Sequence, residues 1–580
     1  MKDGKAPLLE AMAAYAAGGR LGFHMPGHQQ GKGLQPAFVR LLASYGAALD
    51  LTELPSLDNL AAPTGSIAQS QEAMAALAGA REAYYMVNGS SGGLEASILA
   101  MSGPDIPTLM PAHSHISIYD GLILSGSKPV ILPCLVDYQW GLPLGIDREA
   151  VERYLAGGAP AQALWITVNP TYHGLIADLA WERILLETRS GWAWLADEAH
   201  GAHLMFARKQ NIAETKDNYA ENVEGDTKEQ ILTALQCGAQ VVVQSAHKMG
   251  LGFTQTAILY CNSERLSGKI RQAIRILQTS SPSYLLLASL DAWQAYLRED
   301  GPAQMEKAEA LAAELADRIR AIEGYRLWQD ESNHSKPPNG EFRDSKFHHG
   351  ELYCNGLRRG ADACLIDPRK LTISAKDIGL NGFTLADILA KEYRIDVELA
   401  AESHILCIVN PGHSEEDIAR LADALKGIRE RYAKRSARTA IPDNIRITRG
   451  ASGVAPETSA MIQGAGGLGH AKNTFTDGGV HEKLLASMYR AGQKPYTPAI
   501  TPREAFLAPR RTIRLDQSYG CLSAVAVVPC PPGVPLLFPG ATITKESAEV
   551  AADWVRAGQT CAGIEARDDH LWIEVVDDRR

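Results

Sequence analysis

The chain has 580 residues, of which 46% are hydrophobic and 21% charged, and its formal net charge is −10. This length allows a large core and more than one domain, and the acidic balance gives no basic surface for nucleic acid. Apolar runs fall short of a membrane span, the first residues lack a signal peptide's apolar region, and the nine cysteines form no Cys-x-x-Cys pair. We expect a reduced, cytoplasmic protein that binds neither nucleic acid nor membrane.

Residues 1–60 are predicted to form an N-terminal arm. A short helix is expected over residues 7–18, where a glycine pair would end it. Two loops follow, one over residues 22–28 with two histidines and one over residues 50–60 with several carboxylates. The two histidines have no third ligand at useful spacing, so we predict no metal site.

From residue 61 to about residue 300, apolar strands alternate with turns and helices. The first helix is expected over residues 66–80, and the strands over residues 84–87, 107–110, 164–168, 192–196 and 241–243. Polar clusters follow these strands directly, which is typical of the ligand-binding edge of an open parallel sheet. The predicted fold is therefore α/β, with a mostly parallel sheet between layers of helices.

The first polar cluster runs from Asn88 to Gly93, and a helix is expected to begin after it, at Leu94. Small residues at a helix start leave backbone N–H groups open beside hydroxyls, which is how proteins bind phosphate. Ser90, Ser91 and Gly92 are thus candidate phosphate ligands. A simple helix cap would have a similar composition, so both interpretations stay open.

Two other strand ends carry opposite charges, Asp197 and, 51 residues later, Lys248. A desolvated lysine amine loses its proton more easily, which suits a lysine that bonds to an aldehyde; the alternative is a lysine that reaches solvent from the strand end. An aspartate can keep a pyridine nitrogen protonated. Together with the phosphate loop, their order predicts a pyridoxal 5′-phosphate (PLP) site.

Residues 301–435 are predicted to form a smaller domain, with helices and strands expected over residues 302–323, 371–374, 384–393, 405–409 and 414–433. Residues 436–480 are rich in Gly, Ser and Thr and are predicted to be a flexible linker, followed by a C-terminal domain over residues 481–580. Residues 208–230 and 328–350 are polar and aperiodic and are predicted to be exposed insertions.

The sequence resembles the Orn/Lys/Arg decarboxylases, which are PLP-dependent enzymes of fold type I. The resemblance is close over about residues 20–300, weaker from 365 to 433, and returns at 503–545. Its specific motifs are residues 23–28, 50–55, 197–203, 244–248 and 279–284. It implies a seven-stranded, mostly parallel sheet in a large PLP-binding domain (61–300), joined to a smaller α+β domain and a C-terminal α+β domain.

The resemblance also implies roles for individual residues. Lys248 corresponds to the Schiff-base lysine, Asp197 to the partner of the pyridine nitrogen, and His115 to the histidine that stacks on the cofactor ring. The remaining implied cofactor-binding residues are Ser90, Ser91, Gly92, His200, Ser245 and His247, with His200 on the substrate face of the ring and counted as catalytic together with Lys248, Asp197 and His115. His200 and His203 could instead only cap the strand end, and Glu198 is predicted to be a structural ion-pair residue.

Three positions depart from the family pattern. The basic residues before the stacking histidine are replaced by a run that begins at Ala112, the glutamate after Pro539-Gly540 is Ala541, and the tyrosine before Pro-Pro-Gly is Cys530. The missing glutamate matters because it would lie near the distal cation of a basic substrate. Glu53, Asp58 and Asp516 are the alternative carboxylates.

The implied function is decarboxylation of a basic amino acid to its amine and CO2, as in polyamine biosynthesis. Arginine is the first choice, then lysine or ornithine, and the resemblance implies a homodimer or higher homo-oligomer with active sites at the interface. Two alternatives stay open: another fold-type-I PLP reaction, such as aminotransfer or lyase chemistry, and a protein that keeps the fold without turnover.

Overall fold

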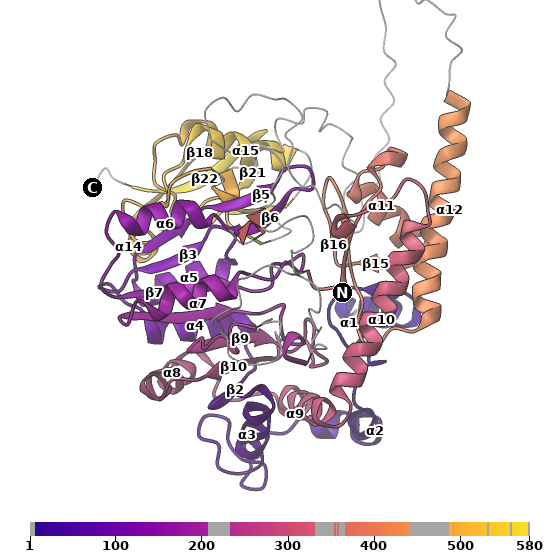
Figure 1. Ribbon diagram of the computed structural model, residues 1–580, viewed down its shortest axis with the longest axis horizontal. Coiled ribbons are helices and arrows are strands. Elements are labelled where there is room, and N and C mark those ends of the chain that lie inside the picture. Colours follow the sequence, from indigo (N-terminus) through magenta and orange to yellow (C-terminus); the bar gives the residue numbers. More distant parts are fainter. Residues whose placement is uncertain are drawn as a thin grey trace, which may run out of the picture.

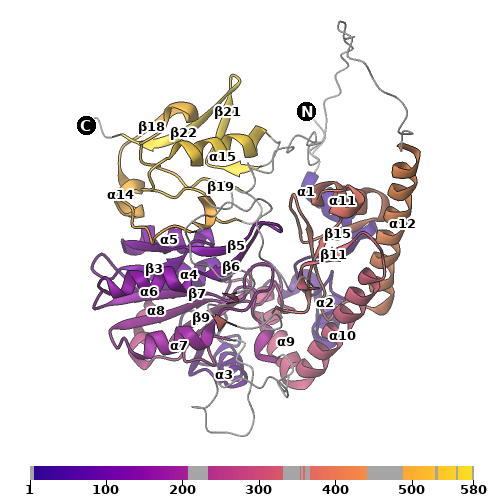
Figure 2. The same cartoon turned by 45° about the horizontal axis from the view of Figure 1, so that its top comes forward.

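The computed structural model describes residues 6–206, 233–330, 353–354, 357–358, 366–439, 487–490, 492–529, 533–556 and 560–577. The predicted insertion at 208–230, residues 331–350 of the second insertion and the predicted linker from residue 440 lie outside these ranges. Figures 1 and 2 show a large α/β unit, a small unit on one side of it, and a C-terminal unit stacked on another side.

A seven-stranded sheet forms the centre of the large unit, in the order β2-β10-β9-β8-β7-β3-β4. Strands β9, β8, β7, β3 and β4 run parallel, while β10 is antiparallel to both β9 and β2. The strands are β2 (Glu82–Met86), β3 (Thr108–Pro111), β4 (Pro129–Leu132), β7 (Ala163–Val168), β8 (Trp192–Asp197), β9 (Val241–Ser245) and β10 (Ala257–Cys261). The predicted fold class is confirmed.

Successive residues of the central strands belong to two different cores, because side chains alternate between the faces of a sheet. Val241 and Val243 of β9 lie in the core on the first face, while Val242 lies in the core on the second face. The first face is covered by α4 (Gly89–Met101), α5 (Ile116–Ser125) and α8 (Glu264–Leu277). The second is covered by α3 (Ser66–Ala78), α6 (Arg148–Ala156), α7 (Leu179–Glu187) and α9 (Tyr284–Glu299). Burial on both faces explains the almost continuous apolar runs.

Helix α4 begins at Gly89, not at the predicted Leu94, so the expected phosphate loop is the first turn of the helix. Gly89 has a φ of +71°, which turns the chain directly from strand to helix. Gly93 faces the sheet, where a Cβ would lie 2.9 Å from a methyl group of Val243. The glycines that lower intrinsic helix propensity therefore allow α4 to pack closely on β9, and tertiary packing overrides propensity.

The small unit contains a four-stranded antiparallel sheet in the order β11-β14-β17-β16. Its elements are β11 (Arg326–Leu327), β14 (Lys370–Ser374), β16 (Leu399–Ala400), β17 (Ile405–Ile408), α10 (Gly301–Arg320), α11 (Gly382–Ile388) and α12 (Glu415–Thr439). Strand β1 (Leu21–Phe23) pairs in parallel with β15 (Ile395–Val397), and its side chains lie in the core of this unit. Helix α1 (Pro7–Ala17) precedes it. The N-terminal segment thus joins the small unit, and α12 extends past residue 436.

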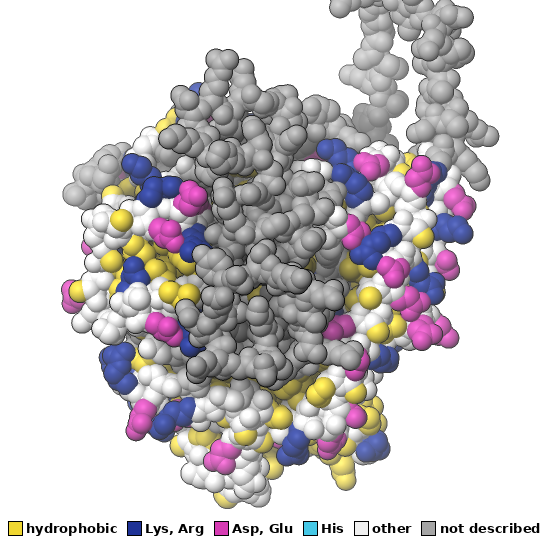
Figure 3. Space-filling model, viewed as in Figure 1, with side chains coloured by type: hydrophobic (Ala, Val, Ile, Leu, Met, Phe, Trp, Pro, Cys, Tyr) yellow, Lys and Arg dark blue, Asp and Glu magenta, His cyan; other side chains and the backbone are white. Residues whose placement is uncertain are grey.

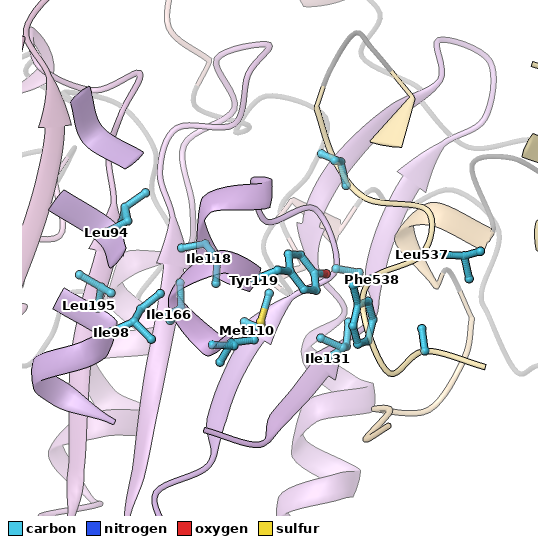
Figure 4. Close-up of a cluster of buried hydrophobic side chains, with 14 of the residues drawn as sticks. Leu94, Ile98, Met110, Ile118, Tyr119, Ile131, Ile166, Leu195, Leu537 and Phe538 are labelled. Atoms are coloured by element: carbon cyan, nitrogen blue, oxygen red, sulfur yellow. The ribbon is translucent and has the colours of Figure 1, made fainter. Parts of the chain in front are cut away.

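The C-terminal unit packs on α5 and shares the core of the first sheet face. It contains α14 (Pro502–Leu507), β18 (Arg510–Arg514), α15 (Lys545–Arg556), β21 (Glu565–Arg567) and β22 (His570–Val576). The ring of Phe538 lies 4.9 Å from that of Tyr119 on α5, as Figure 4 shows. The backbone of Tyr496 exchanges two hydrogen bonds with Ile131 on β4, at 2.7 and 2.9 Å. The edge of the large sheet is covered in this way.

Over the described surface in Figure 3, Lys and Arg side chains are interspersed with Asp and Glu. On α10, for example, Arg318 pairs with Glu314 at 2.7 Å. Among the described residues, no helix has the length and apolar character needed to cross a membrane.

Candidate active site

Asp197 and Lys248 lie at the carboxyl edge of the large sheet on adjacent strands. Asp197 is the last residue of β8 and pairs in register with Val243 of β9, and Lys248 follows the end of β9 by three residues. Asp197 is buried, and its Oδ1 accepts a hydrogen bond from the backbone of Ala199 at 3.1 Å. Burial raises the pKa of Asp197, and the nearby charge of Lys248 acts in the opposite direction.

The amine of Lys248 lies 3.1 Å from Nε2 of His200. Burial lowers the pKa of this amine, and the carboxylates of Asp197 and Glu398 partly oppose that shift. Burial, followed by the charge of Lys248, holds the pKa of His200 well below its usual range. A neutral imidazole thus faces an amine that loses its proton more easily than a free lysine, so the pair can exchange a proton.

Ser90 and Ser245 join the first turn of α4 to the end of β9. The hydroxyl of Ser245 donates to that of Ser90 at 2.8 Å, and both residues are buried. Gly92 is also buried, and a Cβ there would lie 2.9 Å from the side chain of Asn88. Ser91, in the same turn, is partly exposed. The first turn of this 13-residue helix has N–H groups without intrahelical partners, so hydroxyls and backbone donors gather at one point.

His115 and His247 lie around the same site. His115 caps α5, where its Nδ1 accepts a hydrogen bond from the backbone of Ser117 at 3.2 Å. Nδ1 of His247 donates to the carbonyl of Thr256 at 2.9 Å. Both histidines act electrostatically on His200, so all three belong to one site. The C-terminal unit also reaches it, because a Cβ on Gly533 would lie 3.6 Å from the ring of His115.

Sequence reasoning missed a group of polar side chains at the point where the small unit meets the site. The hydroxyl of Tyr172, in the loop after β7, donates to Oε1 of Glu398 at 2.5 Å. The amine of Lys370 donates to the backbone carbonyl of Tyr172 at 2.9 Å. Lys370 lies in a fully buried strand, and a lysine there is unusual enough to have been a signal. Burial lowers its pKa to about 7.

His203, three residues after His200, also contacts the small unit. Its Nε2 lies 3.0 Å from Oδ2 of Asp367, and both side chains are buried. His203 therefore joins the loop after β8 to the start of β14, a pairing across 164 positions that no local pattern could have indicated.

The predicted ion-pair role for Glu198 is wrong, because its described partners are uncharged donors. Its carboxylate accepts hydrogen bonds from Asn169 at 2.8 Å, the backbone of Ala234 at 2.6 Å and Gln244 at 2.9 Å. These donors are amides, and burial raises the pKa of Glu198 to about 7, with the charge of Asp197 acting in the same direction.

The carboxylates considered for a distal cation have other partners. Both oxygens of Asp58 accept hydrogen bonds from backbone N–H groups at the start of α3, including that of Gly65 at 2.8 Å. Burial alone would raise the pKa of Asp58, but these hydrogen bonds outweigh it and lower the pKa to about 2. Asp516 pairs with Arg514. Glu53 is partly exposed and accepts a hydrogen bond from the hydroxyl of Thr52 at 2.6 Å. In the described parts of the chain, no three His, Cys, Asp or Glu side chains gather as metal ligands do.

The arrangement fits PLP. Ser90, Ser245 and the first turn of α4 offer hydroxyl and N–H donors for a phosphate, and Asp197 is a buried carboxylate suited to a pyridinium nitrogen. The amine of Lys248, whose pKa is lowered by burial, lies at the same edge of the sheet. The fold and the site thus define the class of protein, a fold-type-I PLP-dependent enzyme.

Comparisons with known proteins give the particular family. The family profile "Orn/Lys/Arg decarboxylase, major domain" matches residues 6–417, and that for the "C-terminal domain" of the same family matches residues 482–562. The chain belongs to the Orn/Lys/Arg decarboxylase family, whose members are lyases with PLP as cofactor. The resemblance found in the motifs is confirmed.

The relatives match over almost the whole of this chain. An arginine decarboxylase of Bacillus subtilis (strain 168) is 29% identical and covers 100% of this chain and 99% of its own. An arginine decarboxylase of Halalkalibacterium halodurans is 30% identical over 96% and 95% of the two chains. The constitutive lysine decarboxylase of Escherichia coli (strain K12) is 25% identical, covering 94% of this chain and 76% of its own.

Solved structures agree on the fold. The structure of the E. coli constitutive lysine decarboxylase matches with a TM-score of 0.65 and 20% identity, covering 99% of this chain and 82% of that one. The lysine decarboxylase of Francisella novicida matches with a TM-score of 0.66 and 19% identity, over 99% and 82%.

Proposed function

We propose that this enzyme decarboxylates a basic amino acid to its amine and CO2, with arginine as the first substrate and lysine or ornithine as the next. The observation that carries the choice of arginine is sequence identity. The arginine decarboxylases of B. subtilis and H. halodurans are 29% and 30% identical to this chain, whereas the lysine decarboxylase of E. coli is 25% identical.

Each site residue has a task in this proposal. PLP, when bound, supplies an aldehyde for covalent bonding and a pyridine ring that accepts the electron pair left when CO2 departs from the substrate. Ser90, Ser91, Gly92 and Ser245 would hold its phosphate. Lys248 would bond to the aldehyde, and Asp197 would keep a proton on the ring nitrogen. His115 would cover the ring face.

Proton transfer falls to Lys248 and His200. The separation of 3.1 Å between Nζ and Nε2 lets His200 take a proton from the lysine amine or return it. Either residue can then donate a proton to the substrate Cα after CO2 has left. His247, whose Nδ1 donates to Thr256, orients the backbone that carries Lys248.

We also propose a cytoplasmic homodimer. The six cysteines whose side chains are described form no disulfide, as in a reducing compartment. Helix α1 carries exposed Leu8, Leu9 and Met12, and its side chains have no buried face. Apolar side chains gathered on one surface are typical of an interface between subunits.

The experiment is release of amine and CO2 from arginine, lysine, ornithine and norleucine by the purified holoenzyme, with keto-acid formation measured in parallel. We expect arginine to react fastest and to give equal amounts of amine and CO2. Lys248→Ala is the control without turnover. Faster reaction of norleucine would contradict the basic substrate, and keto-acid as the main product would indicate an aminotransferase.

A further inference from the structure

Glu398 lies between β15 and β16 of the small unit, and backbone groups fix its position. The backbone N–H of Met25 donates to Oε2 of Glu398 at 2.9 Å, and the N–H of Glu398 itself donates to the carbonyl of Leu406 on β17. Met25 follows β1, which pairs with β15. The position of Glu398 is thus fixed by the backbone of the small unit, and its Oε1 contacts Tyr172 of the large unit.

Tyr172 of the large unit is held at both ends by the small unit. Its hydroxyl donates to Oε1 of Glu398 at 2.5 Å, and its carbonyl accepts from Lys370 at 2.9 Å. Burial, and then the charge of Glu398, raises the pKa of Tyr172 well above its usual range. The hydroxyl therefore keeps its proton and acts as a fixed donor to the carboxylate.

The ring of Tyr172 packs on His200, with the ring centroids 4.7 Å apart and the planes at 59°. Among the described residues, the buried Nδ1 of His200 has no hydrogen-bond partner. A functional histidine is normally oriented by a hydrogen bond at its second nitrogen. Here the packing of Tyr172 takes over that task, and Nε2 of His200 remains directed at Lys248, 3.1 Å away.

We propose that Glu398 is a positioning residue of the active site: through the hydroxyl of Tyr172 it fixes the ring of His200 against the amine of Lys248. The contacts form one chain from small unit to large unit, Glu398 to Tyr172 to His200 to Lys248. The proton exchange between His200 and Lys248 then depends on the small unit, to which none of the proposed cofactor-binding residues belongs. This inference rests on the proposed function only for the kinetic part of its test; the measurement on the apoprotein is independent of it.

The carboxylate also supplies negative charge to a site with two buried lysines. Glu398 raises the pKa of both Lys248 and Lys370. A residue that only connected the two units would affect stability without affecting the protonation of Lys248. The two roles therefore differ in a measurable quantity.

The test compares Glu398→Gln, Glu398→Asp and Tyr172→Phe. Glu402→Gln is the matched control, because Glu402 is a half-buried carboxylate four residues further along the same unit that faces Lys376. In the apoprotein, the apparent pKa of Lys248 is measured by trace acetylation and peptide mass spectrometry. We expect Glu398→Gln to lower it by roughly 0.5 unit or more, because a neighbouring carboxylate is lost. Glu398→Asp and the control should leave it unchanged.

In the holoenzyme, Tyr172→Phe and Glu398→Gln should each lower kcat by roughly tenfold, with KM changed by less than about twofold. The kcat of the double variant should be no lower than that of the more impaired single variant, because both changes interrupt the same chain of contacts. Multiplied losses, or an unchanged Lys248 pKa with only a lower melting temperature, would overturn the proposal. A wild-type enzyme that releases no amine would refute the proposed function and leave the apoprotein measurement valid.

Discussion

The hydroxyl of Ser245 donates to that of Ser90 at 2.8 Å, across 155 positions of sequence. This bond joins the end of β9 to the first turn of α4. It places two hydroxyls beside the N–H groups at the start of the helix that have no intrahelical partner. A phosphate there would gain charge-assisted hydrogen bonds and a favourable helix dipole at once. The contact would therefore preorganise the proposed phosphate site before the cofactor binds.

Replacing either serine should weaken cofactor binding without unfolding the protein. We expect Ser90→Ala and Ser245→Ala each to raise the Kd for PLP by roughly tenfold, the effect of one charge-assisted hydrogen bond of about 1.5 kcal/mol. Ser97→Ala is the control on the same helix, because the Ser97 hydroxyl donates only to the carbonyl of Gly93. Fluorescence titration of the apoprotein measures the Kd, and equal affinities for all variants would contradict the phosphate site.

Lys248 and Lys370 are two buried amines near one another, and only the first should bond to the cofactor. The amine of Lys370 already donates to the carbonyls of Thr171 and Tyr172. After borohydride reduction of the holoenzyme, we expect the cofactor on the Lys248 peptide alone. Lys248→Ala should abolish the adduct, whereas Lys269→Ala, on the exposed side of α8, should leave it intact. Mass spectrometry of the digest decides, and an adduct on Lys370 would refute the assignment.

The sequence was sufficient to predict the residues at strand ends, for a physical reason. Strands buried on both faces are apolar throughout, so a charged residue that interrupts one, such as Asp197 or Lys248, marks the edge of the sheet. The start of α4 was predicted five residues late, because its glycines lower helix propensity while the packing of Gly93 on Val243 favours the helix.

The contribution of the small unit could not be predicted in the same way. Tyr172 meets Glu398 across 226 positions, and His203 meets Asp367 through a loop and a second sheet. Such pairs depend on how two units pack, and neither periodicity nor turn chemistry reports on that. The sequence held one signal of this contribution, which was a lysine, Lys370, at the start of the otherwise uncharged strand β14.

Glu182 should make the stability of the protein depend on pH. Its Oε2 accepts from the indole of Trp165 at 3.1 Å and from the hydroxyl of Thr167. Burial raises its pKa to about 8, against about 4.3 in an unfolded chain. Because the folded state binds the proton more tightly, the stabilising contribution is complete below about pH 4.3 and is lost as the pH rises through about 8.

Glu182→Gln should remove this pH dependence. Between about pH 5 and pH 9, we expect wild type to lose roughly 2–4 kcal/mol of unfolding free energy relative to the variant. Glu187→Gln is the control, since Glu187 lies at the end of the same helix, where it is exposed and pairs with Arg183. Urea denaturation of the apoprotein at several pH values measures the difference. Parallel curves for wild type and Glu182→Gln would show that the carboxyl group is ionised throughout.

The exposed apolar side chains of α1 should be required for dimer formation. Leu9 is 66% exposed and Met12 is 59% exposed, and in an interface each would bury apolar area worth about 1.5–3 kcal/mol. A charge there would be desolvated without a partner. We expect Leu9→Asp combined with Met12→Asp to convert the dimer to monomer.

Ile184→Asp is the matched control for this pair, because Ile184 on α7 is equally exposed, at 65%, but is not on α1. Sedimentation velocity of the holoenzyme gives the oligomeric state, and amine release gives the activity. If the active site is shared between subunits, the α1 variant should lose activity in parallel with dimer, and activity should return as protein concentration rises. A fully active monomer would contradict a shared site, and a dimer that persists in the α1 variant would move the interface elsewhere on the surface.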